Sequence, residues 1–162
     1  MTFSMPSTSE FTLRPATNAD GANVFALVAG VLHEYGFKPD PEGTDADLGD
    51  IEANYLVRGG SFDVLFDGDG RLVGSVGLYP QGATTCELRK MYLAADVRGG
   101  GWGKRLLDHA LTRARELGFK RVTLETAAVL ETAIGLYQRR GFRPLEARHL
   151  AARCNQAYYL DL

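Results

Sequence analysis

A cluster of glycines with basic residues at its edges has the clearest chemical character in this sequence. Residues 97–107 read VRGGGWGKRLL, with Arg98 before the glycines and Lys104 after the last of them. Glycine lets a backbone approach a ligand without a Cβ in the way, and a helix that begins here offers free N–H groups to an anion. The pattern is typical of phosphate binding, and the alternative is a Gly-rich turn with two solvated basic residues.

Two common phosphate-binding motifs do not fit the cluster. A Walker loop needs GxxxxGK followed by Ser or Thr, but Arg98 stands five residues before Gly103, and Arg105 follows Lys104. A dinucleotide fingerprint needs GxGxxG, and its third glycine would fall on Lys104. A third pattern, R-x-x-G-x-G, fits Arg98, Gly101 and Gly103.

The surrounding segments predict a mixed α/β domain. Alternating apolar residues predict strands, and the turn DGDG between two of them predicts a hairpin. Apolar residues spaced by three and four predict helices, two of which end at Gly118 and Gly141. We expect strands near 11–17, 61–66, 71–79, 84–93, 120–126 and 156–162, helices over 21–35, from the glycine cluster to 117 and over 130–140, and a short helix within 38–56.

Composition narrows the class of protein. The 162 residues, 45% of them hydrophobic, predict one domain over 10–162, preceded by a Ser/Thr-rich flexible segment, 1–9. A net charge of −2 argues against a nucleic-acid partner, and no apolar run suggests a membrane span. The start MTFSMPSTSE lacks the features of a signal peptide, and the distant Cys86 and Cys154 fit a reducing compartment, so we expect a cytoplasmic protein.

In these surroundings the R-x-x-G-x-G pattern resembles the pyrophosphate-binding loop of the GCN5-related N-acetyltransferase (GNAT) superfamily. The preceding CELRKMYL is similar to the family's fourth strand, and AIGLYQRRGF, 133–142, to its A-I-x-L-Y-x-x-x-G-F element. The order of elements matches from Phe11 to Leu162. The resemblance implies an α/β GNAT fold, a mixed, mostly antiparallel sheet of about six to seven strands with about four helices, splayed between strands four and five.

The resemblance also implies acetyl-CoA as cosubstrate and no metal. The pantetheine arm would lie along the backbone of the fourth strand, at Met91, Tyr92 and Leu93. The pyrophosphate would be held by Arg98, Gly99, Gly100, Gly101, Trp102, Gly103 and Lys104. Since Gly99 and Gly100 occupy variable places of the motif, we expect a side chain to be tolerated there.

In this family an amine attacks the thioester directly, which requires a proton acceptor and a proton donor. Tyr137 matches the family's tyrosine acid, and Glu87 stands where some members carry a glutamate base or water-orienting residue. Strand alternation predicts Glu87, Arg89, Met91 and Leu93 on one face. The alternatives are a structural ion pair of Glu87 with Arg89, and an ordinary buried aromatic at Tyr137. The oxyanion would be met by a backbone N–H near Leu93.

The acceptor is less defined than the cofactor. Residues 39–52 carry six acidic residues and no Lys or Arg, which indicates either an attractive field for a cationic amine or a solvated acidic surface. His33 and Tyr35 are candidates for the acceptor pocket, and Arg89 is a candidate for reading a substrate carboxylate. The resemblance therefore implies transfer to a primary amine of a small molecule or peptide.

One position departs from the family pattern. Many members carry Asn three residues before the AI pair, where it contacts the cofactor, but this chain has Leu130. The alternative function is thus a GNAT-fold module that binds acyl-CoA without turnover, as a sensor or interaction domain. A homodimer is compatible with either function.

Overall fold

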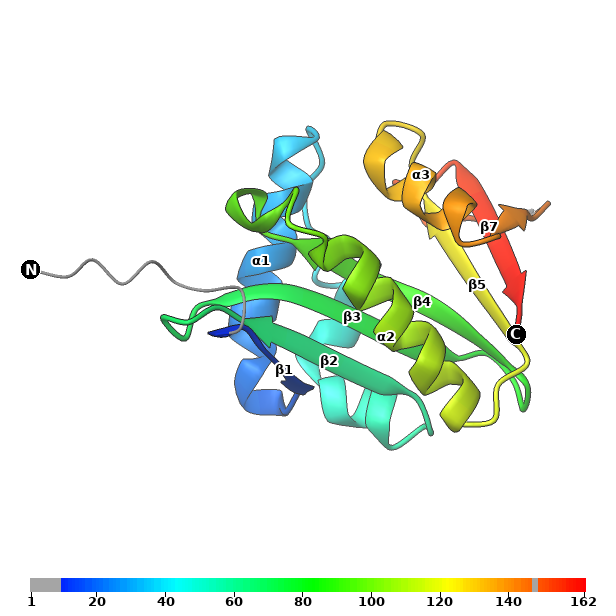
Figure 1. Ribbon diagram of the computed structural model, residues 1–162, viewed down its shortest axis with the longest axis horizontal. Coiled ribbons are helices and arrows are strands. Elements are labelled where there is room, and N and C mark those ends of the chain that lie inside the picture. The colour runs from blue at the N-terminus through cyan, green and yellow to red at the C-terminus, as the bar shows by residue number, and fades with distance from the viewer. Residues whose placement is uncertain (1–9, 147–148) are drawn as a thin grey trace, which may run out of the picture.

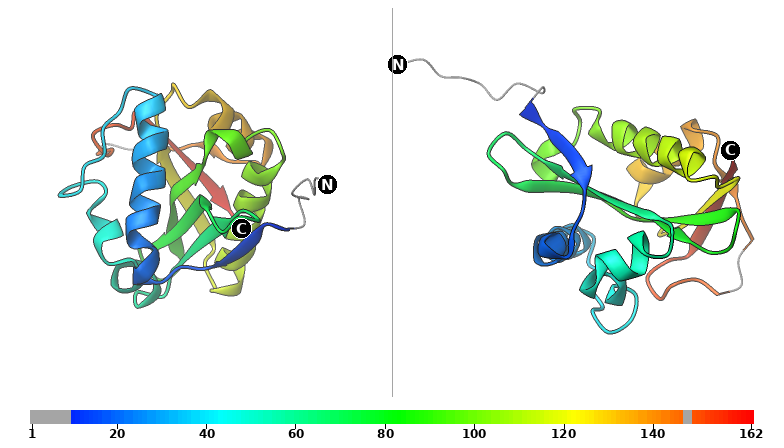
Figure 2. Two further views of the ribbon diagram at one scale, coloured as in Figure 1. Left: turned by 90° about the vertical axis from the view of Figure 1, so that its left-hand side faces the viewer. Right: turned by 90° about the horizontal axis from the view of Figure 1, so that it is seen from below.

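The computed structural model describes residues 10–146 and 149–162, so the predicted flexible segment 1–9 lies outside the described residues. Its centre is a seven-stranded sheet in the order β1-β2-β3-β4-β5-β7-β6. Helix α1 covers one face of the sheet, and α2 and α3 lie on the other (Figures 1 and 2). The predicted α/β class is therefore confirmed.

The elements fall close to their predicted ranges. The strands are β1 (Thr12–Pro15), β2 (Ser61–Phe66), β3 (Leu72–Pro80), β4 (Thr85–Leu93), β5 (Arg121–Thr126), β6 (Arg143–Pro144) and β7 (Gln156–Asp161). The helices are α1 (Gly21–Glu34), α2 (Trp102–Glu116) and α3 (Glu131–Arg139). Where about four helices were expected, the described residues form these three and short helical turns at Asn18–Asp20, Ala46–Gly49, Glu52–Leu56 and Ala95–Val97.

The sheet opens between β4 and β5, as predicted. Every other neighbouring pair is antiparallel, whereas β4 and β5 run parallel. Their pairing stops after three positions, the last of which is Glu87 opposite Thr123. Beyond Glu87 the edge of β4 that faces β5 has no strand partner among the described residues, so its peptide groups can accept an extended ligand.

Each face of the sheet has its own hydrophobic core. The buried stripe of α2 packs on one face and consists of Leu106, Leu107, Ala110, Leu111 and Ala114. On the other face, α1 buries Val24, Val28 and Leu32 against Tyr55 and Phe62. Each fully buried aliphatic side chain contributes about 1.5–3 kcal/mol. Together these cores fix the helices on both sides of the β4–β5 opening.

A β-bulge interrupts β4 beside the opening. Ser75 pairs with Tyr92 and Gly77 with Arg89, so the single residue between them in β3 faces both Lys90 and Met91. Lys90 has a φ of +55°, and its carbonyl accepts a 2.7 Å hydrogen bond from the Ser75 hydroxyl. One extra residue reverses the alternation of side chains beyond it.

The bulge corrects the predicted common face of β4. Arg89 stacks on Tyr79, which belongs to the core on the α1 side, and Glu87 shares that side. Met91 and Leu93 instead pack against the core beneath α2. The expectation that all four side chains share one face was wrong, because strict alternation does not allow for the additional residue at Lys90.

No helix in residues 10–146 and 149–162 combines the length and apolar character needed to cross a bilayer.

Candidate active site

A cavity of about 740 Å³ lies where β4 and β5 separate. Its walls come from both sides of the sheet: the loop before α2, the first turns of α3, the end of α1, and the segments at 43–44 and 151–154. From the predicted cofactor site it is lined by Met91, Tyr92, Leu93, Arg98, Gly99, Gly101, Gly103 and Lys104, and from the predicted catalytic and acceptor sites by Glu87, Tyr137, Tyr35 and Arg89. Most of the predicted site residues therefore meet around one space.

The glycine loop has a backbone that side chains disfavour at two positions. Gly99 and Gly101 both have a φ of +85°, in the left-handed region. Gly101 precedes α2 and supplies no side-chain cap, so the first N–H groups of the helix remain available to a ligand. Gly100 lacks a positive φ, and a Cβ there would lie 3.9 Å from the Val97 carbonyl oxygen. The backbone at Gly100 therefore accepts a side chain, as expected. The same expectation for Gly99 was wrong, because its positive φ disfavours any side chain.

Two predicted members of the loop do not line the cavity. Trp102 is buried, and the centroid of its ring lies 5.1 Å from that of Phe11. The Arg105 guanidinium stacks on the Trp102 ring, 3.8 Å from the ring centroid. It therefore fastens the start of α2 to the sheet. Gly100 is exposed and lies outside the lining, whereas a Cβ on Gly103 would point into it, 3.5 Å from Leu136.

The Arg98 guanidinium is already engaged in this structure. It donates to the Leu93 carbonyl at 2.9 and 3.1 Å, and to Glu34 Oε2 at 2.6 Å. Because Glu34 belongs to the last turn of α1, this ion pair connects the loop before α2 with the opposite face of the sheet. Any anion that binds Arg98 must share it with, or take it from, a carboxylate of the protein itself.

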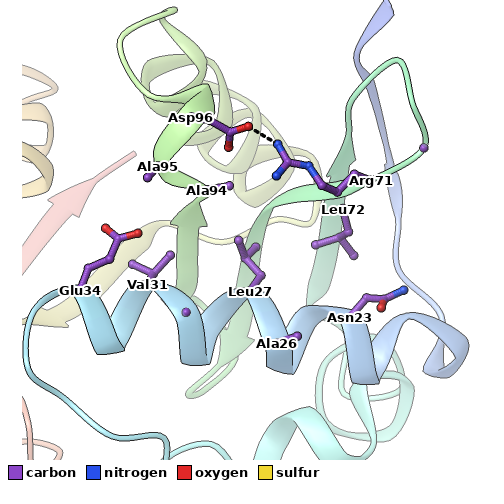
Figure 3. A pocket seen from close by; sticks show the side chains of 12 residues that line it. Asn23, Ala26, Leu27, Val31, Glu34, Arg71, Leu72, Ala94, Ala95 and Asp96 are labelled. Carbon is purple, nitrogen blue, oxygen red and sulfur yellow. Dashed lines mark hydrogen bonds and ion pairs between the residues drawn. The ribbon is translucent and has the colours of Figure 1, made fainter.

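A second cavity, of about 590 Å³, lies on the other side of this ion pair. Figure 3 shows its floor along α1, with Glu34 and Val31 facing the segment that carries Ala95 and Asp96. Arg71 and Asp96 form an ion pair across it. Val31 lines both cavities, so the Glu34–Arg98 pair stands at the boundary between them.

Tyr137 lies on α3 and is 6% exposed. Its ring packs against Phe142 with centroids 5.7 Å apart, which fixes its orientation. Burial, together with the nearby Tyr92, raises the pKa of Tyr137 above the ordinary value of a phenol. The hydroxyl is therefore protonated at neutral pH and can act as a proton donor toward the cavity.

Two carboxylates face the cavity from the two separating strands. Glu87 is buried and accepts hydrogen bonds from Arg89 Nε and, at 2.9 Å, from Gln81 Nε2. Glu125 on β5 accepts the Ala151 N–H at 3.1 Å. Burial and the charge of Glu87 raise the pKa of Glu125. Thus the predicted ion pair of Glu87 with Arg89 is present, and Glu125 is a second carboxylate at the opening, on the neighbouring strand.

The sequence pattern did not single out Glu125. The residue is one of several charged side chains in a strand, and only the pairing of Thr123 with Glu87 brings it to the opening. Tyr35 lines the cavity, whereas the exposed His33 lies outside its lining. Leu130, which precedes α3, lines the cavity at the place of the family's usual Asn.

The acidic segment 39–52 is only in part a solvated surface. Asp45 and Asp47 are buried beside Lys90, whose Nζ lies 3.1 Å from Asp45 Oδ1 and 3.3 Å from Asp47 Oδ1. Arg153 donates to both oxygens of Asp45, at 2.6 and 2.9 Å. Burial alone would raise the pKa of Asp45, but the hydrogen bonds from Arg153 and from the Asp40 N–H, together with the charge of Lys90, outweigh burial and lower the pKa to about 2. These two carboxylates are therefore not free to attract a cationic acceptor.

Known proteins match this chain over most of its length. The model of the acetyltransferase (GNAT) family matches residues 29–142. The Escherichia coli K12 protein named Uncharacterized N-acetyltransferase YjgM is 36% identical over 139 residues, 83% of this chain and 83% of that protein. Human N-acetyltransferase 8B is 33% identical over 102 residues, which are 60% of this chain and 45% of the human protein.

Solved structures share the fold. A GNAT-family acetyltransferase from Staphylococcus aureus Mu50 superposes with a TM-score of 0.86 at 23% identity, covering 93% of this chain and 98% of that chain. A GNAT-superfamily phosphinothricin acetyltransferase from Sinorhizobium meliloti, solved in complex with AcCoA, has a TM-score of 0.73 at 20% identity, with 94% and 89% covered. The predicted resemblance is confirmed, and the chain belongs to the GNAT family of acetyltransferases.

Proposed function

We propose that this chain is an N-acetyltransferase that moves an acetyl group from acetyl-CoA directly to a primary amine. One observation carries the proposal: a single cavity is lined by the glycine loop before α2 at one part and by Tyr137 and Glu125 at another. An anion-binding loop, a proton donor and a proton acceptor around one space are the parts that acyl transfer to an amine requires.

The residues present fit acetyl-CoA. The left-handed Gly101 leaves the N-terminus of α2 uncapped, and Arg98 and Lys104 line the same part of the cavity. These groups would hold the diphosphate through backbone N–H groups and charge-assisted hydrogen bonds. The unpaired edge of β4 at 91–93 would hold the amides of the pantetheine arm. When bound, acetyl-CoA supplies the activated acetyl thioester.

The chain's own residues would move two protons. A lysine-like amine with a pKa of about 10.4 must lose its proton before it attacks, at a cost of about 4.6 kcal/mol at pH 7. In the balanced reaction the amine nitrogen bonds to the acetyl carbon and the carbon–sulfur bond breaks. The ammonium gives its first proton to water, a carboxylate receives the second proton from nitrogen as the amide forms, and the departing sulfur takes the Tyr137 hydroxyl proton. Proton exchange with water then restores the carboxylate and the Tyr137 hydroxyl.

Glu125 is the better placed of the two carboxylates for the amine proton. Both oxygens of Glu87 already accept hydrogen bonds, from Arg89 and Gln81. Glu125 accepts one backbone N–H, and its raised pKa brings it closer to the working pH of a general base. In this assignment Glu87 holds Arg89 in place, whereas the sequence-based hypothesis makes Glu87 itself the base or the residue that orients a water.

The proposed acid is tested with Tyr137→Phe. Turnover is measured as CoA release from acetyl-CoA with a panel of polyamines, amino acids and short peptides. Loss of a general acid lowers kcat by about 10²–10⁴-fold. The matched control is Tyr158→Phe, a buried tyrosine of β7 whose hydroxyl bonds to Gln156. Equal activities of the two variants would contradict the role of Tyr137.

The proposed base is tested by comparing Glu125→Gln with Glu87→Gln. If Glu125 takes the proton, its variant loses the limb of the pH profile that reports a base in kcat/KM, and Glu87→Gln keeps that limb with a lower rate. The opposite result would restore Glu87 as the base.

The second candidate is a module that binds acyl-CoA without turnover, which is favoured by the apolar Leu130 in the cavity wall. Thermal stabilisation by acetyl-CoA with no CoA release on any amine would establish that function instead.

A further inference from the structure

A buried charge network lies against the cavity on the side of the sheet away from α2. Asp45 lies on the segment after α1, Lys90 on the bulge of β4, and Arg153 on the segment before β7. Their side chains are 0%, 5% and 14% exposed. Three segments that are distant in sequence are thus fastened together next to the opening between β4 and β5.

The contacts of the network cross the opening. Lys90 Nζ also donates to the Thr44 carbonyl at 3.0 Å, and Thr44 and Arg153 both line the cavity. Figure 2 shows the segment after α1 and the segment before β7 meeting on the face of the sheet opposite α2. The two hydrogen bonds from Arg153 to Asp45 join them. Such a two-point contact fixes both distance and orientation.

The network balances its own charge. Asp45 and Asp47 stand against Lys90 and Arg153, two anions against two cations. A buried pair of this kind resists separation, because removing one partner leaves an uncompensated charge. The connection between the two segments is therefore a fixed part of the wall.

We infer, resting on the proposed function, that the acceptor is a small free amine enclosed by the cavity, and that amines carried on a polypeptide are excluded. The glycine loop lies on the α2 side, so an acceptor must reach the acetyl group from the opposite face. A peptide acceptor needs an open groove there for the rest of its chain. In this protein the Asp45–Arg153 connection occupies that path.

The experiment measures binding of two conjugates, so it does not depend on turnover. CoA is joined through an acetyl bridge either to one amine of putrescine or to the N-terminal amine of a decapeptide, and each Kd is measured by calorimetry. We expect the putrescine conjugate to bind at least as tightly as CoA, and the decapeptide conjugate to bind about tenfold or more weakly than the putrescine conjugate. Equal affinities for the two conjugates would overturn the inference.

The variant Arg153→Ala tests the network itself. Opening the wall should bring the Kd values of the two conjugates closer together. The control Arg121→Ala, which removes the exposed Arg121–Asp161 pair, should leave the ratio of the two Kd values unchanged. If a folded Arg153→Ala protein keeps the wild-type ratio of the two Kd values, the network does not exclude peptide acceptors. Where that variant does not fold, Arg153→Gln serves instead, because its shorter side chain loses the two-point contact with Asp45 and leaves a polar group in the wall, and the same narrowing is expected.

The proposed function fails by a different result. Absence of CoA release with every free amine would count against acetyl transfer, whereas the ratio of the two conjugate affinities would still decide how large an acceptor the cavity admits.

Discussion

Replacing Asp45 by Asn is the most direct test of the charge network as a structural element. The substitution keeps the size of the side chain and its position beneath the surface, where Asp45 is fully buried. It removes the negative charge that faces both Lys90 and Arg153. Asp47 then remains as the nearest carboxylate, at 3.3 Å from Lys90. One cation of the network is left without its partner.

The expected loss of stability follows from the pKa of Asp45. Burial would raise it, but the hydrogen bonds from Arg153 and from the Asp40 N–H, together with the charge of Lys90, lower it from an ordinary 3.8 to about 2. That difference corresponds to about 2.5 kcal/mol in favour of the folded state. Removing one partner of a buried ion pair costs about 3–5 kcal/mol. We therefore expect Asp45→Asn to lose about 3 kcal/mol at pH 7, or about 6–12 °C in Tm for a domain of this size.

The pH dependence has a definite sign. Because the folded pKa of Asp45 is depressed, its stabilisation is fully present above the unfolded value of 3.8 and is lost as the pH falls through about 2. The variant has no group that titrates at this position. At pH 3 the difference in the free energy of unfolding between wild type and Asp45→Asn should therefore be smaller than at pH 7 by about 1 kcal/mol.

Urea unfolding followed by circular dichroism at pH 7 and pH 3 measures both quantities. The control is Asp161→Asn, which removes an exposed partner of Arg121 and should leave the unfolding midpoint unchanged. An Asp45→Asn protein as stable as wild type at pH 7 would refute the reasoning. A stability difference between wild type and Asp45→Asn that is larger at pH 3 than at pH 7 would refute it as well.

Two further predictions concern the glycine loop and its ion pair. Gly101→Ala should weaken acetyl-CoA binding, because a side chain at a φ of +85° costs about 1–2 kcal/mol and shifts the start of α2. Gly100→Ala should bind acetyl-CoA with the wild-type affinity. Calorimetry with acetyl-CoA measures both affinities, and equal losses in the two variants would mean that the loop is only a turn. Glu34→Gln should tighten CoA and acetyl-CoA binding severalfold, because it frees Arg98 from a competing carboxylate at 2.6 Å. Weaker binding by Glu34→Gln, measured as Kd at low salt, would show that Glu34 instead holds Arg98 in its binding position.

Local patterns were sufficient for the elements and the loop. Amphipathic spacing predicted α1 and α2, because helix formation depends on which residues lie three and four apart. The spacing of Arg98, Gly101 and Gly103 placed the glycine loop at the N-terminus of α2, because a left-handed residue before a helix is a local requirement that glycine meets.

Parts of the candidate site depend on pairings that no local pattern contains. The bulge at Lys90 arises from the register between β3 and β4, and it reversed the predicted side-chain faces. Glu125 reaches the cavity only because β5 lies beside β4 in the fold. The free charge expected in segment 39–52 is in part buried and paired.

The sequence by itself thus determined the order of elements, the family resemblance and the loop before α2, because each rests on residues close together in the chain. Only the tertiary structure decided which charges face one another. Arg153 stands 108 positions from Asp45, and packing of the segments around the sheet brings them within hydrogen-bonding distance. The shape of the acceptor end of the cavity follows from that long-range contact, since hydrogen bonds and ion pairs act over a few ångströms in space whatever the separation in sequence.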